Sequence, residues 1–178
     1  AISKKLVEEM GGTITFESKK GVGSTFVIRV PFKIDLDADK REESKDVSEK
    51  SIKGMHVLLA EDNELNMEIA EFLLQNEGAE VTKAWNGQEI VELFRKSEAG
   101  EFDVILMDIM MPVMNGYEAT KMIRSLDRED AKTIPIIAMT ANAFTEDRIR
   151  AKAAGMDEHV AKPVDVELLI KVIHKLVK

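Results

Sequence analysis

From Met55 onward, short apolar runs alternate with longer stretches of helical periodicity, and this alternation constrains the fold more than any other feature of the chain. Each of five apolar runs is short enough to be a strand, and a segment with apolar residues at helical spacing follows it. Five consecutive βα units predict an α/β fold, in which helices cover both faces of a parallel sheet. The expected strands are HVLLA (56–60), EVTKA (80–84), DVILM (103–107), IPIIAM (134–139) and EHVA (158–161).

The helices between these strands are expected from the spacing of their apolar residues. In the first helix, over 63–78, four apolar residues fall on one stripe: Leu65, Ile69, Phe72 and Leu73. The other four helices are expected over 87–100, 116–127, 144–155 and 165–178.

The first 52 residues follow a different pattern. Residues 1–10 predict a short helix that Gly11 and Gly12 end, and two alternating runs (13–18 and 25–32) predict a β-hairpin around the turn KKGVGS. Such a unit is too small to fold alone. The mostly charged stretch 34–52 predicts a solvated linker. We therefore expect three parts: 1–33, a linker 34–52, and a domain over 53–178.

Two features of the N-terminal part suggest further expectations. The chain opens without a methionine, in a helix with no capping residue before it, so we infer a piece of a longer protein. The second hairpin strand carries its apolar residues on one face, which makes self-association through the hairpin an expectation. These residues are Phe26, Ile28, Val30 and Phe32.

The composition excludes several classes of protein. Of 178 residues, 44% are hydrophobic and 33% charged, and the net charge is −8. An acidic chain without a basic patch argues against nucleic-acid binding. No apolar run approaches the ~20 residues that span a membrane, and no signal peptide is visible. The absence of cysteine excludes disulfides and fits a reducing cytoplasm. We expect a cytoplasmic fragment that is not membrane-embedded, whose parent protein can still carry a membrane anchor.

Polar and charged residues gather where four of the five expected strands end. In open α/β sheets the ligand site lies outside the carboxyl ends of the strands, so these side chains are expected to meet in one crevice. Three carboxylates in close range repel one another, and a divalent cation such as Mg²⁺ is their natural partner. In chain order, these polar and charged residues are Glu61 and Asp62, Asp108, Thr140 and Lys162; Ala141 and Pro163 directly follow the last two.

This combination predicts a phosphoryl-accepting aspartate. A carboxylate can act as a nucleophile and form an aspartyl-phosphate. Transfer of a phosphoryl group then depends mostly on positioning and on neutralising charge. A lysine supplies a point charge for one phosphoryl oxygen, and a threonine hydroxyl can donate to another.

Four segments resemble the receiver domain of two-component response regulators: LLAEDN, ILMDIMMPVMNG, IIAMTAN and HVAKP. Their order and spacing agree with that family over residues 55–177. The resemblance implies a flavodoxin-like (βα)5 fold, doubly wound, with strand order 2-1-3-4-5. It also implies that Asp108 is the phosphoacceptor and that Glu61 and Asp62 hold Mg²⁺, with Asp62 the more direct ligand. The backbone carbonyl of Met110 is implied as a third protein ligand.

The resemblance assigns the remaining positions to phosphate contact and switching. Thr140, Ala141 and Lys162 match the positions that contact the phosphoryl group or respond to it. Pro163 matches a proline that often follows a cis bond. His159 occupies the position where many members carry a switch Tyr or Phe, and so departs from the aromatic pattern.

Residues 1–33 resemble the tail of the ATP-binding catalytic domain of histidine kinases, through GVGSTF and the preceding glycine pair. Such a tail followed by a linker and a receiver is the layout of a hybrid histidine kinase. The residues that hold nucleotide in that domain would lie upstream, so we expect no enzyme activity of its own from this fragment.

The function expected is Mg²⁺-dependent transfer of a phosphoryl group from a phosphohistidine to Asp108. The donor is the histidine kinase of the same parent chain, and the acceptor that follows is a histidine phosphotransfer protein. Two alternatives remain at this point. One is a docking scaffold that is never phosphorylated, and the other is ATP-dependent kinase activity.

Overall fold

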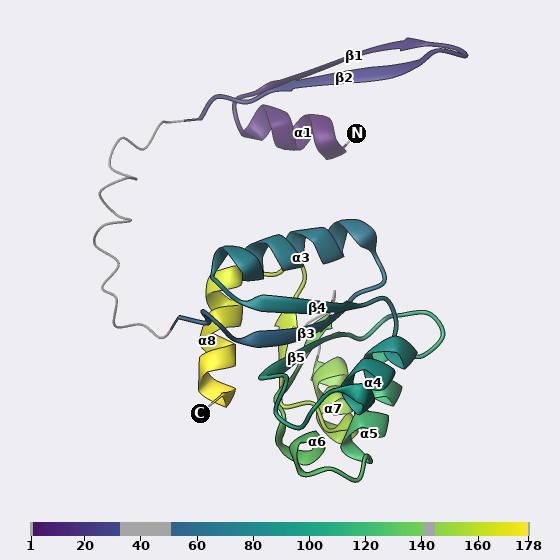
Figure 1. The fold of residues 1–178 in the computed structure, drawn as a ribbon. Coiled ribbons are helices and arrows are strands. Elements are labelled where there is room, and N and C mark those ends of the chain that lie inside the picture. Colours follow the sequence, from purple (N-terminus) through teal and green to yellow (C-terminus); the bar gives the residue numbers. More distant parts are fainter. Residues whose placement is uncertain (1, 33–50, 141–144, 178) are drawn as a thin grey trace. The chain divides into compact units, whose positions relative to one another are not determined.

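The computed structural model describes residues 2–32, 51–140 and 145–177 (Figure 1). The chain divides into two compact units, 1–48 and 49–178. None of the helices in these described stretches has the length and apolar character that crossing a membrane requires. Ala141 lies outside the described residues.

The N-terminal unit is a helix followed by an antiparallel hairpin: α1 (Ile2–Glu9), β1 (Thr13–Lys19) and β2 (Gly23–Arg29). Gly11 ends the helix with φ 72°. Thr13 pairs with Arg29, so the ladder has no partner for residues beyond Arg29. Val30 and Phe32, which the alternation predicted as part of the strand, therefore lie outside β2.

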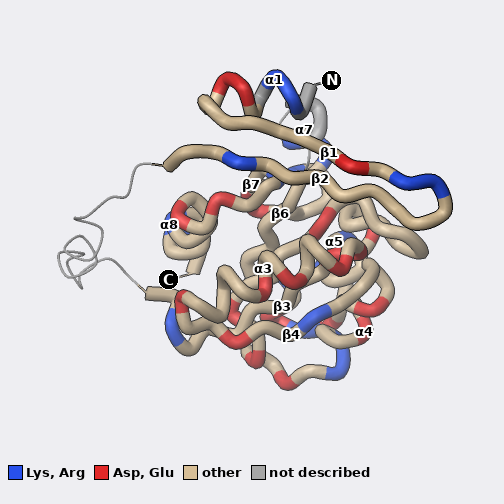
Figure 2. Tube along the Cα trace, turned by 90° about the horizontal axis from the view of Figure 1, so that it is seen from above, with Lys and Arg blue, Asp and Glu red and all other residues tan. Residues whose placement is uncertain are grey.

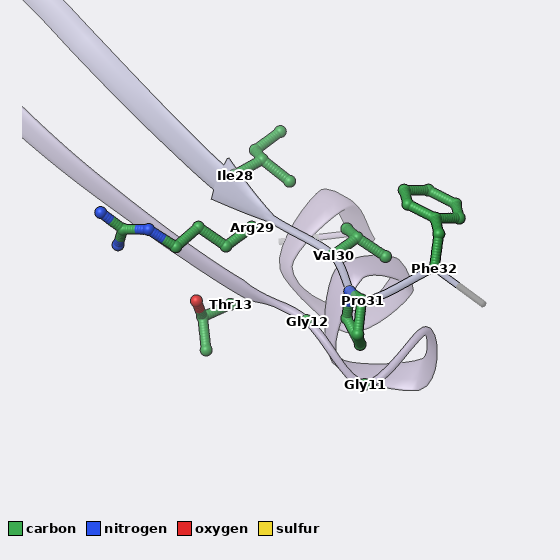
Figure 3. A pocket seen from close by; sticks show the side chains of 8 residues that line it. All are labelled: Gly11, Gly12, Thr13, Ile28, Arg29, Val30, Pro31 and Phe32. Atoms are coloured by element: carbon green, nitrogen blue, oxygen red, sulfur yellow. The ribbon is translucent and has the colours of Figure 1, made fainter. Parts of the chain in front are cut away.

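A shallow hollow marks the point where α1 meets the ends of the hairpin strands (Figure 3). A Cβ at Gly12 would lie 2.4 Å from the carbonyl oxygen of Arg29, so the close approach there requires glycine. On one face of the hairpin, the rings of Phe16 and Phe26 stack with their centroids 5.8 Å apart. Both rings are mostly exposed.

The second unit contains a five-stranded parallel sheet of order β4-β3-β5-β6-β7. Numbered within this unit, the order is 2-1-3-4-5, and the predicted doubly wound topology is confirmed. The strands are β3 (His56–Ala60), β4 (Glu80–Ala84), β5 (Val104–Asp108), β6 (Ile136–Thr140) and β7 (Glu158–Ala161).

Helices cover both faces of this sheet (Figure 1). On one face lie α3 (Glu64–Asn76) and α8 (Val166–Leu176), and on the other α4 (Gly87–Lys96), α5 (Gly116–Arg124) and α7 (Thr145–Ala154). Alternate residues of each central strand point to opposite faces. In β3, Val57 and Leu59 pack toward α3 and α8, whereas Leu58 and Ala60 pack toward α4 and α5.

Helix α3 buries a different face from the stripe that the spacing singled out. Its buried residues are Met67, Ala70 and Leu74. The stripe residues Leu65, Ile69 and Phe72 are exposed. The helix therefore carries two apolar faces, of which one packs on the sheet and the other faces solvent.

A short helix, α6 (Glu129–Thr133), was not predicted from the sequence. Arg128, just before it, donates to the carbonyl oxygens of Phe94, Ser97 and Glu98 at 2.5, 3.1 and 3.0 Å. The same guanidinium binds both carboxylate oxygens of Asp130. These contacts connect α6 to the end of α4.

Arg124 makes a second set of such contacts at the end of α5. It donates to the carbonyl oxygens of Gly155 and Ala131 at 3.0 and 2.9 Å and to Asp157 at 2.8 Å. Asp157 in turn accepts a bond from the backbone N–H of Ile136. Arg124 thus connects α5 to α6, to the segment before β7 and to the start of β6.

Candidate functional site

The carboxyl ends of the strands bring an acidic cluster together. Glu61 follows β3 and is 2% exposed, Asp108 ends β5 and is 5% exposed, and Asp62 is exposed to solvent. One carboxylate oxygen from each of the three residues lies within 4.8 Å of the others. Two of the three charges are buried, so the cluster needs a positive partner.

Lys162, which follows β7, supplies a positive charge to this cluster. Its Nζ lies 2.7 Å from Oδ2 of Asp108 and also binds Oε2 of Glu61. With Lys162 included, the formal charge of the cluster is −2. Two buried carboxylates, an exposed third one and this residual charge fit a divalent cation with oxygen ligands.

The pKa values of Asp108 and Lys162 reflect burial and their mutual contact. Burial raises the pKa of Asp108 above its ordinary 3.8; the nearby Glu61 charge acts in the same direction, and Lys162 and the Met110 N–H act against it. Burial alone would lower the pKa of Lys162, but its bonds to Asp108 and Glu61 outweigh this, so that pKa is raised. Lys162 is therefore a firmly charged ammonium beside a more basic carboxylate than usual.

The start of α3 places a further polar group against Glu61. Asn63 caps the helix, since its side-chain oxygen accepts a bond from the backbone N–H of Asn66 at 3.1 Å. The side-chain amide of Asn66 donates to Oε1 of Glu61 at 3.0 Å. Glu61 is thus held through both oxygens, one by Asn66 and one by Lys162.

The loop after β5 is shaped by three local features. The backbone N–H of Met110 donates to Oδ1 of Asp108 at 3.2 Å, and the Met110 side chain is exposed. Val113 has a positive φ of 67°, unusual for a β-branched residue. A Cβ at Gly116 would lie 2.2 Å from the carbonyl oxygen of Asp108, so α5 can begin this close to the aspartate only with glycine.

The remaining candidate residues lie on β6 and just after β7. Thr140 is buried at the end of β6, and its carbonyl accepts a bond from the Lys162 N–H at 2.8 Å. His159 is half-buried in β7, with Nδ1 3.3 Å from Oε1 of Glu158. The Lys162–Pro163 peptide bond is cis.

Asn66 was not among the residues singled out in the sequence. Its signal was the segment EDNELN, in which an amide residue lies three positions after an Asn that can cap a helix. That spacing turns the side chain back toward residues before the helix.

A doubly wound sheet with acidic, hydroxyl and lysine residues at its carboxyl edge defines the class of phosphoryl-accepting receivers. Residues 57–174 match the family model of the response regulator receiver domain, and the chain belongs to this family. Over 176 residues it is 34% identical to the aerobic respiration control sensor protein ArcB of Escherichia coli. That alignment covers 98% of this chain but only 22% of ArcB.

Solved structures lead to the same class. The receiver domain of the sensor histidine kinase PA1611 from Pseudomonas aeruginosa, with magnesium coordinated in its active-site cleft, is 36% identical, with a TM-score of 0.63. The match covers 70% of this chain and 98% of that one. The receiver domain of Saccharomyces cerevisiae Ssk1, crystallised with the histidine phosphotransfer protein Ypd1, is 29% identical with a TM-score of 0.61, over 70% and 90% of the two chains. Residues 57–174 are thus a phosphoacceptor receiver domain of two-component phosphorelay signalling.

Proposed function

We propose that Asp108 is the residue that accepts the phosphoryl group, and that it takes the group from a phosphohistidine. The observation that carries this proposal is the position of its carboxylate, at the end of β5 and 2.7 Å from the ammonium of Lys162. An oxygen of Asp108 attacks phosphorus as the bond between phosphorus and the imidazole nitrogen breaks. The electron pair of that bond remains with the departing imidazole.

The residues that would hold Mg²⁺ are Glu61, Asp62, Asp108 and the backbone carbonyl of Met110. The fit is supported by the clustering of the three carboxylates within 4.8 Å and by the cluster's residual negative charge. When bound, the ion neutralises negative charge on the carboxylates and on the phosphoryl oxygens.

Other side chains orient the reacting group. The Met110 N–H holds Oδ1 of Asp108, which limits rotation of the carboxylate. Burial raises the pKa of Asp108, which makes its ionised carboxylate a stronger nucleophile than that of an exposed aspartate. Lys162 and the Thr140 hydroxyl are proposed to donate to the phosphoryl oxygens.

The proposed output is a shift between two states of the β6–β7 edge. New negative charge at Asp108 attracts the Thr140 hydroxyl, and we expect positions 141 and 159 (Ala141 and His159) to respond to this change. A phosphoryl group or a partner that binds one of the two states more tightly shifts the population of the protein toward that state. The face formed by these elements then binds its partners differently.

Intact mass after incubation with acetyl phosphate tests the phosphoacceptor. The wild type is expected to gain one phosphoryl group in Mg²⁺ and none in EDTA, and Asp108→Asn is expected to gain none. Phosphorylation of Asp108→Asn would contradict the proposal. If the wild type gains nothing even from a phosphohistidine donor, the docking-scaffold alternative is favoured.

We propose a histidine phosphotransfer protein as the partner, docked on the exposed face of α3. Leu65, Ile69 and Phe72 are 64%, 49% and 67% exposed and lie on one face of a helix that starts beside Glu61 and Asp62. Acidic residues recur along the same helix, so a partner with an apolar patch and a basic rim would fit (Figure 2).

Substitution of this face tests the partner. The double variant Ile69→Ala/Phe72→Ala is expected to weaken binding to a histidine phosphotransfer protein by about tenfold or more. Labelling by acetyl phosphate should not change, because neither residue belongs to the acidic cluster. Ile149→Ala is a matched control, since Ile149 is 64% exposed on α7, on the other face of the sheet. Equal loss of binding in both variants would contradict docking on α3.

For residues 1–33 we propose the end of a kinase ATP-binding domain, joined by the linker 34–52 to the receiver over 53–178. The full protein would be a hybrid histidine kinase whose phosphorelay works in the cytoplasm, while this fragment is not itself a kinase. An ATP titration by calorimetry tests the last point, and saturable binding would contradict it. We also propose that the exposed hairpin face mediates self-association.

A further inference from the structure

Asn66 has a contact with the acidic cluster that the proposed phosphoryl transfer does not explain. Its amide Nδ2 donates to Oε1 of Glu61 at 3.0 Å, although the residue itself is exposed. Its backbone is fixed as well, because the N–H of Asn66 donates to the capping side chain of Asn63. The amide is therefore held against a carboxylate that is 2% exposed.

The two oxygens of Glu61 face different groups. Oε2 binds the Lys162 ammonium, which at the same time contacts Oδ2 of Asp108, so Oε2 is the oxygen on the side of the phosphoacceptor. Oε1 is on the side of α3, bonded to Asn66. The carboxylate cannot turn both oxygens toward the crevice without breaking the bond to Asn66.

This orientation matters for the choice of cation. Mg²⁺ requires near-octahedral geometry, keeps several waters and takes carboxylates through single oxygens. Ca²⁺ takes six to eight oxygen ligands and readily binds both oxygens of one carboxylate. A glutamate restricted to one oxygen thus suits the smaller ion. Because the Asn66 amide is neutral, it imposes this restriction without changing the charge of the site.

We propose that Asn66 is a positioning residue that determines cation specificity. By holding Oε1 of Glu61, it leaves only Oε2, which Lys162 also contacts, to face the cation or a water bound to it, and this favours Mg²⁺ over Ca²⁺. The inference rests on the proposed function, because it requires that the cluster binds a divalent cation. It concerns equilibrium binding and needs no phosphoryl transfer to be tested.

The test is isothermal titration of the full chain with MgCl2 and, separately, with CaCl2. Asn66→Leu keeps a side chain of similar size but cannot donate, and Asn66→Ala is a second variant at this exposed helix position. In both variants the ratio of the Ca²⁺ to the Mg²⁺ dissociation constant is expected to fall by about tenfold relative to wild type. Mg²⁺ should bind more weakly and Ca²⁺ at least as tightly.

Gln75→Leu is the matched control. Gln75 lies on the same helix and donates its amide to Oε1 of Glu71 at 3.3 Å, so the control also removes an amide–glutamate bond from α3. Its ratio of dissociation constants should equal that of the wild type. Thermal melts of all variants show whether the fold is retained.

The outcomes separate this inference from the function on which it rests. If the wild type binds Mg²⁺ and the Asn66 variants keep the wild-type ratio, Asn66 has no role in specificity and the inference fails, while the proposed function stands. The inference also fails if both ions weaken by the same factor. If the wild type binds neither ion, the metal-dependent function and the inference fail together.

Discussion

Lys162 is the residue on which the resting state of the site depends most. It neutralises part of the charge on Glu61 and Asp108, two carboxylates that are almost completely buried. Lys162→Met keeps the bulk of the side chain and removes the charge. In EDTA, we expect the free energy of unfolding to fall by about 3 kcal/mol, because both buried carboxylates lose their partner. Urea unfolding measures this change.

The same variant should bind Mg²⁺ more tightly, since no ammonium competes for the carboxylate oxygens. Added Mg²⁺ is then expected to restore much of the lost stability. Lys83→Met is a suitable control, because Lys83 forms a more exposed pair with Glu71 at 2.8 Å, and its loss should cost about 1 kcal/mol or less. Equal stability of Lys162→Met and wild type in EDTA would contradict the assigned role.

Asp108 itself is expected to reduce the stability of the metal-free protein. Because burial raises its pKa above 3.8, the folded state binds a proton more readily than the unfolded state. Stability therefore falls as pH rises through the raised pKa. Asp108→Asn has no charge to bury and does not lose stability in this way. In EDTA its free energy of unfolding should therefore exceed that of the wild type by about 1 kcal/mol at pH 7, and by little near pH 4. Urea titrations at both pH values test this, and a less stable variant at pH 7 would contradict it.

At the residue scale, the candidate site was largely predictable because strand ends follow from the limits of apolar runs. Glu61, Asp108 and Lys162 were expected at one edge and the structure brings them into contact. Their chemical roles stay predictions. The contact of Asn66 could not be predicted with the same ease, because it depends on the direction of a side chain in the first helical turn.

At the scale of elements, α6 depends on the pair formed by Arg128 and Asp130. The hydrogen bond from Arg128 is the main reason that the pKa of Asp130 is lowered to about 2. A depressed folded-state pKa stabilises the protein above the ordinary value of 3.8, and this stability is lost as pH falls toward 2. Asp130→Asn should thus cost about 1 kcal/mol at pH 7, and the difference from wild type should shrink toward pH 3.

Urea unfolding of both proteins between pH 7 and pH 3 provides the measurement. Glu92→Gln is the control, because it breaks a pair with Lys96 that is 3.4 Å long and more exposed, and it should have a smaller effect. A difference that stays constant over the whole pH range would show that the ion pair is not responsible.

Sequence patterns could not predict two features of the helices. Helix α6 has five residues, too few for a periodic signal, and Arg128 at its N-cap makes no side-chain capping bond. In α3, periodicity identified a helix correctly but could not distinguish the packed face from the exposed one. Both faces are apolar, and only the position of the helix on the sheet decides between them.

For the whole molecule, the division into two compact units predicts that the receiver is independent. A chain of residues 49–178 should have the same free energy of unfolding and the same Mg²⁺ affinity as residues 1–178. If the hairpin face mediates self-association, light scattering should show a larger species for the full chain only. A monomer mass for both chains would rule out self-association, and a less stable truncated chain would contradict independence.

The sheet order was expected through the resemblance to receivers, and the alternation of strands and helices predicted the layers. The boundaries 1–33, 34–52 and 53–178 remain predictions, because sequence patterns show where composition changes and not which residues pack as one body. The hairpin strand ended earlier than its alternation suggested. The pairing of β2 ends at Arg29 because its partner strand β1 begins at Thr13. That point in turn depends on where α1 ends.

Arg124 and Arg128 together donate five hydrogen bonds to main-chain oxygens, and this has a consequence for evolution. Carbonyl oxygens of Ala131, Gly155, Phe94, Ser97 and Glu98 are the acceptors, and a main-chain carbonyl is present whatever side chain the position carries. The surrounding segments can therefore accumulate substitutions without losing these bonds, as long as the two arginines persist. In related sequences, we therefore expect both arginines to be retained even where the neighbouring residues differ.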